Sequence, residues 1–458
     1  MTATQPADST REPGPGHPDP QPTPRGGKTP WLAAIFAVIV PVLPTTSVFP
    51  GPLRGNGSPA RILSYLFFTL IVLGFLVRRR TSDRARVNPG TVIVIVFFLM
   101  QLATYATGLF EVGSPVVEAS KGRTALSLVA QVGITLYILQ TVRTARQRAI
   151  VLGCLITGIA YSCVIGILQG FVGIDLRFLA VPPGFVEVLE TPELTSRQGA
   201  LRVLGTSQHA IEFSVMAAAS VPLSLHLARH ATTPLRRQLA AIAGLLAVAA
   251  VPTAVSRSGV VTLAVALAVY MFAWKVRPIG NAILVGVGVL AAYAVVSPLY
   301  LKALWTTIVS SQSDKSITTR TEDYAAVGEQ FRQDPWFGLG LGGYPPTEFR
   351  YLDNQWLQAV VQGGIVGLAA LALLTLGSVA GMTAALRRST TARDRNLAYA
   401  LGAALIGIAV SSATFDLFSF QQITFVYFIL YGLVWSFHST PTTPDHRKAV
   451  TQEHPPPV

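Results

Sequence analysis

The chain has 458 residues, of which 51% are hydrophobic and only 12% are charged. Soluble globular proteins carry about 25% charged residues, so this composition excludes an ordinary soluble domain and indicates a polytopic membrane protein. The net charge of +13 does not indicate a nucleic-acid partner, because the basic residues form short clusters between apolar segments, as cytoplasmic loops of membrane proteins do.

Residues 1–30 are rich in Pro and Gly and contain no apolar run, which predicts a disordered tail rather than a cleaved signal peptide. Twelve apolar segments follow, each long enough or nearly long enough to cross about 30 Å of hydrocarbon. They cover residues 31–49, 61–77, 91–110, 123–142, 149–171, 206–228, 239–255, 258–274, 281–301, 355–386, 396–414 and 420–437. The sequence therefore predicts an all-α membrane fold of about 12 transmembrane helices, nine within 31–301 and three within 355–437, with a second disordered tail at 438–458.

The loops between these segments alternate in charge. Every second loop is short and basic, and the loops between them contain more acidic residues. The basic positions are Arg78, Arg79, Arg80, Arg84, Arg86, Arg143, Arg146, Arg148, Arg229, Arg236, Arg237, Lys275, Arg277, Arg387, Arg388, Arg393 and Arg395. Since positive loops stay inside, this pattern places the basic loops and both termini in the cytoplasm of a multi-pass protein of the cell membrane.

The longest polar interruption, residues 302–354, is predicted to be one large extracytoplasmic loop. Within it, Thr319-x-x-Glu322 matches a capping box, so we expect a helix that starts at Thr319 and ends near Pro335. Apolar residues recur through this segment at helical spacing, which predicts an amphipathic helix at the membrane surface.

A cluster of glycines follows that predicted helix, at Gly338, Gly340, Gly342 and Gly343. Its spacing formally matches G-x-G-x-x-G, but no strand precedes it and no βαβ unit surrounds it, so we reject a dinucleotide site. The glycines instead predict a tight turn that closely approaches other backbone.

Two arginines of the outer loops stand beside predicted helix starts. Arg257 opens the eighth segment, where free N–H groups and the helix dipole favour an anion, although an arginine at a membrane edge is often only an anchor. Arg320 occupies the first turn of the predicted loop helix, where acidic residues normally stand. A bound external anion explains that placement, and a solvated surface arginine is the alternative.

The pair Asp353-Asn354 directly precedes the tenth segment. A carboxylate at this position can serve as a general base. Both residue types are also good helix caps, and the two roles can coexist. We therefore take Asp353 as a candidate catalytic residue and Asn354 as a candidate substrate-binding residue.

Three more candidate substrate-binding residues surround the outer start of the sixth segment: Arg202, His209 and Glu212. Glu212 is the most informative, because an ionisable group within a span usually lines a cavity or is paired. Arg202 and His209 are its candidate partners. Asp416, in the last outer loop, is either a second cavity-facing acid or a turn residue.

Several of these stretches, taken in chain order, resemble the superfamily of O-antigen ligases and polysaccharide polymerases. The residues that carry the resemblance are Leu204-Gly205-Thr206 to Glu212-Phe213, Ser256-Arg257-Ser258-Gly259, Thr319-Arg320-Thr321-Glu322, Asp334-Pro335-Trp336-Phe337-Gly338 and Asp353-Asn354. Single motifs are weak, but their order around one large loop is fairly specific.

The resemblance implies an integral membrane glycosyltransferase of cell-envelope polysaccharide biosynthesis. Its donor would be a glycan on a polyprenyl diphosphate such as undecaprenyl diphosphate, and its acceptor a second glycan or lipid-glycan, without metal or other cofactor. By position, Arg257 and Arg320 would bind the diphosphate. Asp353 stands where the family often has a histidine proposed as the base, which is a departure. Ligase and polymerase activity remain open alternatives.

A function of another class, a twelve-span secondary transporter or exporter of envelope precursors, predicts ionisable residues near mid-membrane and broken helices in corresponding halves. Glu212 is the only near candidate for such a residue, and we find no internal repeat. No histidine and cysteine cluster has the spacing of a metal site.

Overall fold

The computed structural model describes residues 29–51, 56–77, 87–110, 113–187, 194–273, 276–309 and 314–439. Nearly all of both predicted tails and the arginines at 78–86 lie outside these ranges. Within two of the helices, the side chains of residues 276–279, 281–283 and 314–321 also lie outside the description, and the side chain of Arg320 is one of them.

The described chain is almost entirely helical. Its α-helices are α1 (Trp31–Val42), α2 (Pro59–Val77), α3 (Pro89–Gly108), α4 (Pro115–Thr141), α5 (Ala145–Phe171), α6 (Ala210–His230), α7 (Pro234–Thr253), α8 (Arg257–Met271), α9 (Val276–Val296), α10 (Pro298–Val309), α11 (Asp314–Gln333), α12 (Gln355–Arg388), α13 (Ala392–Ser411) and α14 (Gln421–Trp435). The strands form two short antiparallel pairs, β1 (Ser47–Val48) with β2 (Val186–Glu187) and β3 (Ser196–Arg197) with β4 (Ala200–Leu201).

The predicted helical membrane fold is confirmed in its main features. Eleven of the twelve apolar segments each coincide with one helix of the bundle, and the ninth is divided between α9 and α10. Among the described residues, eight helices are long and apolar enough to cross a membrane, or up to nine if a bent pair counts as one span. The α1 and α8 helices are apolar but shorter. Twelve complete crossings therefore stay a prediction.

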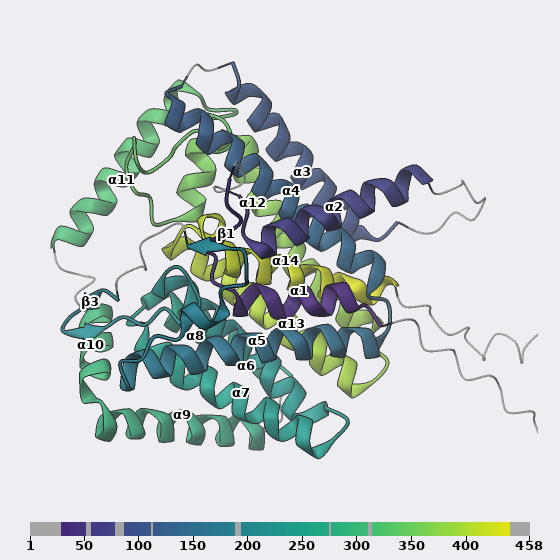
Figure 1. Ribbon diagram of the computed structural model, residues 1–458, viewed down its shortest axis with the longest axis vertical. Coiled ribbons are helices and arrows are strands. Elements are labelled where there is room, and N and C mark those ends of the chain that lie inside the picture. The colour runs from purple at the N-terminus through teal and green to yellow at the C-terminus, as the bar shows by residue number, and fades with distance from the viewer. Residues whose placement is uncertain are drawn as a thin grey trace, which may run out of the picture.

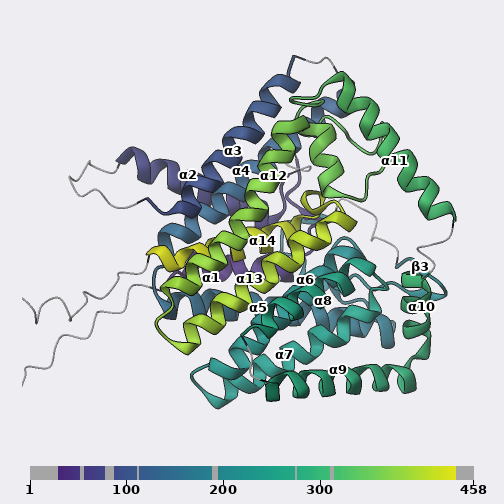
Figure 2. The ribbon, with the colours of Figure 1, turned by 180° about the vertical axis from the view of Figure 1, so that it is seen from behind.

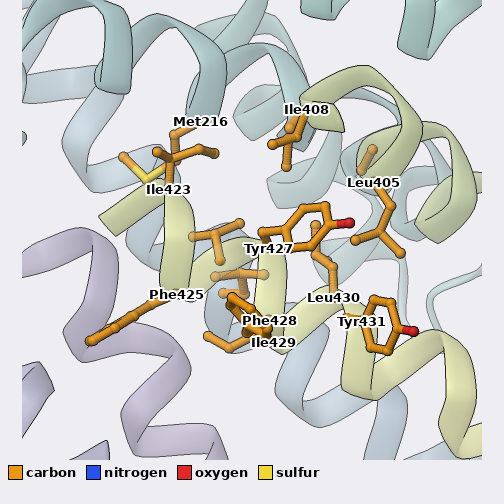
Figure 3. Packing of buried hydrophobic residues seen from close by; sticks show 14 of the residues in the cluster. Met216, Leu405, Ile408, Ile423, Phe425, Tyr427, Phe428, Ile429, Leu430 and Tyr431 are labelled. Carbon is orange, nitrogen blue, oxygen red and sulfur yellow. The ribbon is translucent and has the colours of Figure 1, made fainter. Parts of the chain in front are cut away.

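The core of the bundle is built around α14, which runs through its middle (Figures 1 and 2). Every residue of this helix is buried. Met216 of α6 and Leu405 and Ile408 of α13 pack around it (Figure 3). An apolar helix enclosed on all sides by other helices is what an all-round hydrophobic sequence predicts.

Three basic loops within the described residues lie at one end of the bundle. The Arg148 guanidinium lies 4.1 Å from the centre of the Phe437 ring, and Arg388 donates a hydrogen bond to the His438 carbonyl at 3.5 Å. The charge of Arg393, in the first turn of α13, acts on His230 at the end of α6. The loops after α4, α6 and α12 therefore share one face, as alternating loop charge requires; which side of the membrane this is stays a prediction.

Two predicted segments end differently in the structure. The first was expected over 31–49, but α1 stops at Val42, because Leu43 precedes Pro44 and adopts the extended backbone that a following proline imposes (φ −85°, ψ 129°). The ninth was expected as one span over 281–301, but the chain bends by 113° between the part of α9 from Leu284 to Val296 and α10.

The expected start of the loop helix is also wrong. The helix α11 begins at Asp314, so Thr319 and Glu322 lie inside it rather than at its cap. A capping-box pattern cannot mark a helix start when the residues before it continue the helix. The predicted end near Pro335 is confirmed, since α11 stops at Gln333. The predicted loop 302–354 thus contains the second half of α10 and all of α11, which lies along the outside of the bundle (Figure 1).

The glycine cluster forms the close-approaching turn that the sequence predicted. Residues 335–343 wedge between α3 and a break in α12, where Gly364 has a non-helical backbone (φ 54°, ψ −144°). The loop satisfies α12 backbone groups of both kinds at the break. The Ile365 N–H of α12 donates to the Pro335 carbonyl at 2.9 Å, and the Val361 carbonyl of α12 accepts from the Leu339 N–H at 3.0 Å. The loop therefore fixes the N-terminal part of α12.

Replacing Gly340 by alanine is expected to destabilise the protein by about 2–4 kcal/mol. Gly340 has φ +82°, and a Cβ there would stand 2.5 Å from the Gly108 Cα of α3. Thermal unfolding of the detergent-purified protein measures the effect. Gly328→Ala on α11 is the matched control, because its added Cβ meets nothing within 4 Å. Equal melting temperatures for the two variants would contradict the wedge.

Candidate functional site

The turn between α7 and α8 delivers Arg257 to a helix N-terminus, as predicted. Ser256 is the N-cap and Arg257, half-buried, is the first residue of α8. Val255 before them has φ +45°, a left-handed conformation that is unusual for a β-branched residue and costs of order 1–3 kcal/mol. Such strain persists only where the surrounding fold enforces it. Here the strained residue sets the direction in which the chain enters α8.

A β-hairpin adds two more arginines. Gln198 and Gly199 both have positive φ (53° and 79°), which makes the tight two-residue turn that joins β3 to β4. Arg197 ends β3 and Arg202 follows β4 directly. The hairpin thus presents both guanidinium groups from one short, rigid element.

The segment after the hairpin is fastened to the bundle by side chains of α5. The Gln169 Oε1 atom accepts hydrogen bonds from the N–H groups of Leu204 and Gly205, at 3.1 and 2.9 Å. The Thr206 hydroxyl donates to the Pro41 carbonyl at 2.6 Å. These bonds hold the Leu204-Gly205-Thr206 stretch in place and so fix Arg202 beside the α7–α8 turn.

Only part of the Arg202 guanidinium forms hydrogen bonds within the protein. Its Nε donates to the Ala254 carbonyl at 3.3 Å. Its Nη2 atom is buried and has no hydrogen-bond partner among the described residues. Burial lowers the pKa of Arg202, the charge of Arg197 lowers it further, and Asp353 acts in the opposite direction. A buried guanidinium nitrogen without an acceptor is unfavourable unless an anion completes the site.

Asp353 and Asn354, just before α12, have different roles in the structure. The Asn354 Oδ1 atom accepts from the N–H groups of Trp356 and Leu357, at 2.9 and 3.4 Å, so Asn354 is the cap. The Asp353 carboxylate has no hydrogen-bond partner in the described part of the chain and is accessible to solvent. Because capping falls to Asn354, the Asp353 carboxylate remains available for chemistry.

Asp353 lies at the centre of the site's charges. Desolvation by the surrounding protein raises its pKa, and the negative charge of Asp323 raises it further. Three arginines act in the opposite direction, in decreasing order Arg257, Arg197 and Arg202. The net result is a raised pKa. The hairpin, the α7–α8 turn and the start of α12 therefore converge on one carboxylate.

The loop after α13 brings in a second carboxylate. The Phe415 carbonyl accepts from Gln355 N–H at 3.2 Å, and the Gln355 Oε1 atom accepts from Phe418 N–H at 2.7 Å. Thr414 Oγ1 donates to Ser258 Oγ of α8 at 2.8 Å. This loop thus bridges α8 and α12 and carries Asp416, whose pKa desolvation raises to about 6, with a further contribution from Asp353.

Arg350 connects α11 to the site. Its Nη2 lies 2.6 Å from Glu322 Oε2, and its Nε lies 2.5 Å from Asp323 Oδ1. These carboxylates raise the pKa of Arg350. Position 320 stands one helical turn before Asp323, on the same face of α11. The side chain of Arg320 lies outside the described residues, so its meeting with Arg257 stays a prediction.

His209 and Glu212 are helix caps in this structure. His209 is the N-cap of α6 and its Nδ1 accepts from Ile211 N–H at 3.2 Å. Its pKa is lowered to about 4, first by burial and then by Arg202, so the ring is neutral near pH 7. The Glu212 carboxylate accepts from the N–H groups of Gln208 and Gln422, at 3.1 and 2.6 Å. Its partners are thus backbone amides rather than the Arg202 or His209 that the sequence suggested.

The structure therefore brings Arg257, Arg202 and Asp353 within electrostatic reach of one another, with Asn354 as the cap of α12. His209 lies within electrostatic reach of Arg202, and the Glu212 carboxylate is bound by backbone amides. Sequence reasoning missed Arg197 as a site residue. Its signal was the Gln198-Gly199 dipeptide between two short apolar-containing stretches, a hairpin pattern. It also missed Asp323, which only the pairing of α11 with Arg350 brings near Asp353.

Comparison with known families adds an independent finding. Residues 242–372 match the family model described as O-antigen ligase. This confirms the resemblance seen in the sequence, over the stretch from α7 to the first half of α12, and that stretch contains Arg257 and Asp353. No curated protein matches the chain.

Proposed function

We propose, on the premise that residues 242–372 form a domain of the O-antigen ligase family, that the chain transfers or polymerises a glycan carried by a polyprenyl diphosphate. The reaction would take place at the outer face of the cytoplasmic membrane, with both termini in the cytoplasm. The observation that carries the proposal is the convergence of Arg197, Arg202 and Arg257 on Asp353.

The three arginines suit the diphosphate of the donor. Guanidinium groups bind phosphate oxygens through paired hydrogen bonds, and Arg257 adds the N-terminus of α8, which favours an anion. The unpartnered Nη2 of Arg202 offers a donor that no described residue uses. Arg320 is proposed to approach the same diphosphate from α11. This positive charge replaces the metal ion on which many diphosphate enzymes depend.

The proposed chemistry is a displacement at the anomeric carbon. The acceptor hydroxyl oxygen forms the new glycosidic bond as the bond from carbon to the diphosphate oxygen breaks. Asp353 takes the hydroxyl proton, for which a raised pKa is an advantage. The arginines stabilise the negative charge that develops on the departing polyprenyl diphosphate. Asp416 lies close enough to influence the same proton.

Reconstitution tests this proposal. The purified protein in liposomes is supplied with lipid-linked oligosaccharide extracted from the membranes of its host. The expected result is a longer or transferred glycan together with free polyprenyl diphosphate, without added metal. The alternative, a secondary transporter or exporter of envelope precursors, predicts movement of the lipid-linked glycan across the bilayer with no covalent product.

The acceptor separates ligase from polymerase in the same assay. A polymerase makes longer chains from the lipid-linked glycan alone, because one molecule accepts from another. A ligase gives product only when a different acceptor, such as a lipid-core glycan, is added. Both outcomes support glycan transfer, whereas an intact donor under both conditions would refute it.

A further inference from the structure

A polar cavity of about 340 Å³ lies next to the candidate site, inside the bundle. Its walls come from α2, α3, α4, α12 and the loop after Gly340. Along α4 it runs from Ser120 to Gln131, roughly 16 Å by the rise of a helix. At the site end it is lined by Gln208, Gln355 and Asp416. The cavity therefore reaches the second carboxylate of the site, and neither arginine of the hairpin lines it.

The cavity wall consists mainly of side chains that form hydrogen bonds. Six glutamines contribute to it: Gln101, Gln131, Gln208, Gln355, Gln358 and Gln362. A side-chain amide both donates and accepts, as a sugar hydroxyl does. The guanidinium groups of Arg61 and Arg123, which influence each other electrostatically, add further donors. Such a wall suits a polyhydroxyl compound and opposes a lipid chain.

Two of these glutamines lack partners of their own. Gln101 and Gln131 are only 8% and 5% exposed, and among the described residues neither side-chain amide has a hydrogen-bond partner. Gln358 and Gln362, in contrast, bond to each other at 2.9 Å across one turn of α12. An amide buried within a membrane bundle is unfavourable when unpaired. Two such groups on facing helices indicate a cavity built for a polar ligand.

We propose that this cavity binds the terminal sugar units of the acceptor glycan. The inference rests on the proposed function, because that function places the donor diphosphate at Arg197, Arg202 and Arg257. The acceptor must then approach the anomeric carbon from the other side of the carboxylates. None of these arginines lines the cavity, whereas Asp416 lines it and also interacts electrostatically with Asp353. Its volume falls within the range of about 300–1,000 Å³ that small-ligand sites occupy.

Gln131→Met tests the proposal, with Gln140→Met as its matched control. Both residues lie on α4, but Gln140 is exposed near the far end of the helix and does not line the cavity. Methionine keeps the length of glutamine and removes the amide that would form hydrogen bonds with a ligand. We expect Gln131→Met to raise the acceptor KM about five- to thirtyfold, with the donor KM and the melting temperature unchanged. Gln358→Met on the opposite wall provides the second variant.

A binding measurement separates this inference from the proposed function. The probe is the oligosaccharide released by mild acid from the lipid-linked glycan of the host, titrated calorimetrically into the protein in nanodiscs. Saturable binding that Gln131→Met weakens, without any transfer by the wild type, would leave the cavity site standing and refute glycan transfer. Transfer with an acceptor KM and a probe Kd unaffected by Gln131→Met and Gln358→Met would overturn the acceptor site.

Discussion

Arg257→Ala is expected to lower the rate of glycan transfer at least about a hundredfold, because removing one preorganised donor from a developing negative charge typically costs a factor of 10²–10³. Arg257 combines a half-buried guanidinium with the N-terminus of α8, and it is the arginine that acts most strongly on Asp353. The measurement is the initial rate of product formation in liposomes at saturating acceptor.

Two further variants make the Arg257 result specific. Arg257→Lys keeps the charge but loses the paired hydrogen bonds, so we expect an intermediate rate. Arg332→Ala removes an exposed arginine of α11 that pairs with Glu329, away from the site charges, and should retain wild-type activity. If Arg257→Ala, expressed at the normal level, matched Arg332→Ala in rate, the diphosphate site proposed at α8 would have to be abandoned.

Asp353→Asn is expected to reduce transfer by about 10²–10⁴-fold, the usual contribution of a positioned general base. Asparagine has nearly the same shape but cannot take the acceptor proton. Capping of α12 depends on Asn354, so the variant should fold normally, which thermal unfolding checks. Activity close to that of the wild type would exclude Asp353 as the base and leave Asp416 as the other candidate, because the Asp323 carboxylate is paired with Arg350.

The pH profile gives a sharper test of the same assignment. A base acts only when deprotonated, so activity should fall as the pH drops through the raised pKa of Asp353. Asp323→Asn removes a negative charge that raises this pKa and should move the acidic limb to lower pH. Arg202→Gln removes a positive charge that lowers it and should move the limb to higher pH.

Opposite shifts of the acidic limb in these two variants would identify the titrating group as a carboxylate within reach of both charges. His209 cannot produce such a limb above about pH 5, because its pKa is lowered to about 4. If the acidic limb stayed at the same pH in both variants, the pH dependence of activity would not come from Asp353.

Local sequence patterns predicted local structure well. The placement of Arg257 at a helix start followed from Ser256-Arg257-Ser258-Gly259, and the close turn followed from its glycines. Predictions from local patterns were wrong where neighbouring residues changed the course of the chain. The capping box at Thr319 lies inside α11 because the chain before it is also helical, and α9 and α10 divide at Pro298 although both are apolar.

The amino-acid sequence by itself determined that this is a helical membrane protein and where most of its helices run, because hydropathy and loop charge depend only on neighbouring residues. Only the tertiary structure decided which loops meet. Arg197, Arg257, Asp353 and Asp416 come from four separate segments, and their convergence depends on how α8, α12 and α14 pack, which no local pattern encodes. The glutamine cavity arises in the same way, since its lining is contributed one or a few residues at a time by separate helices.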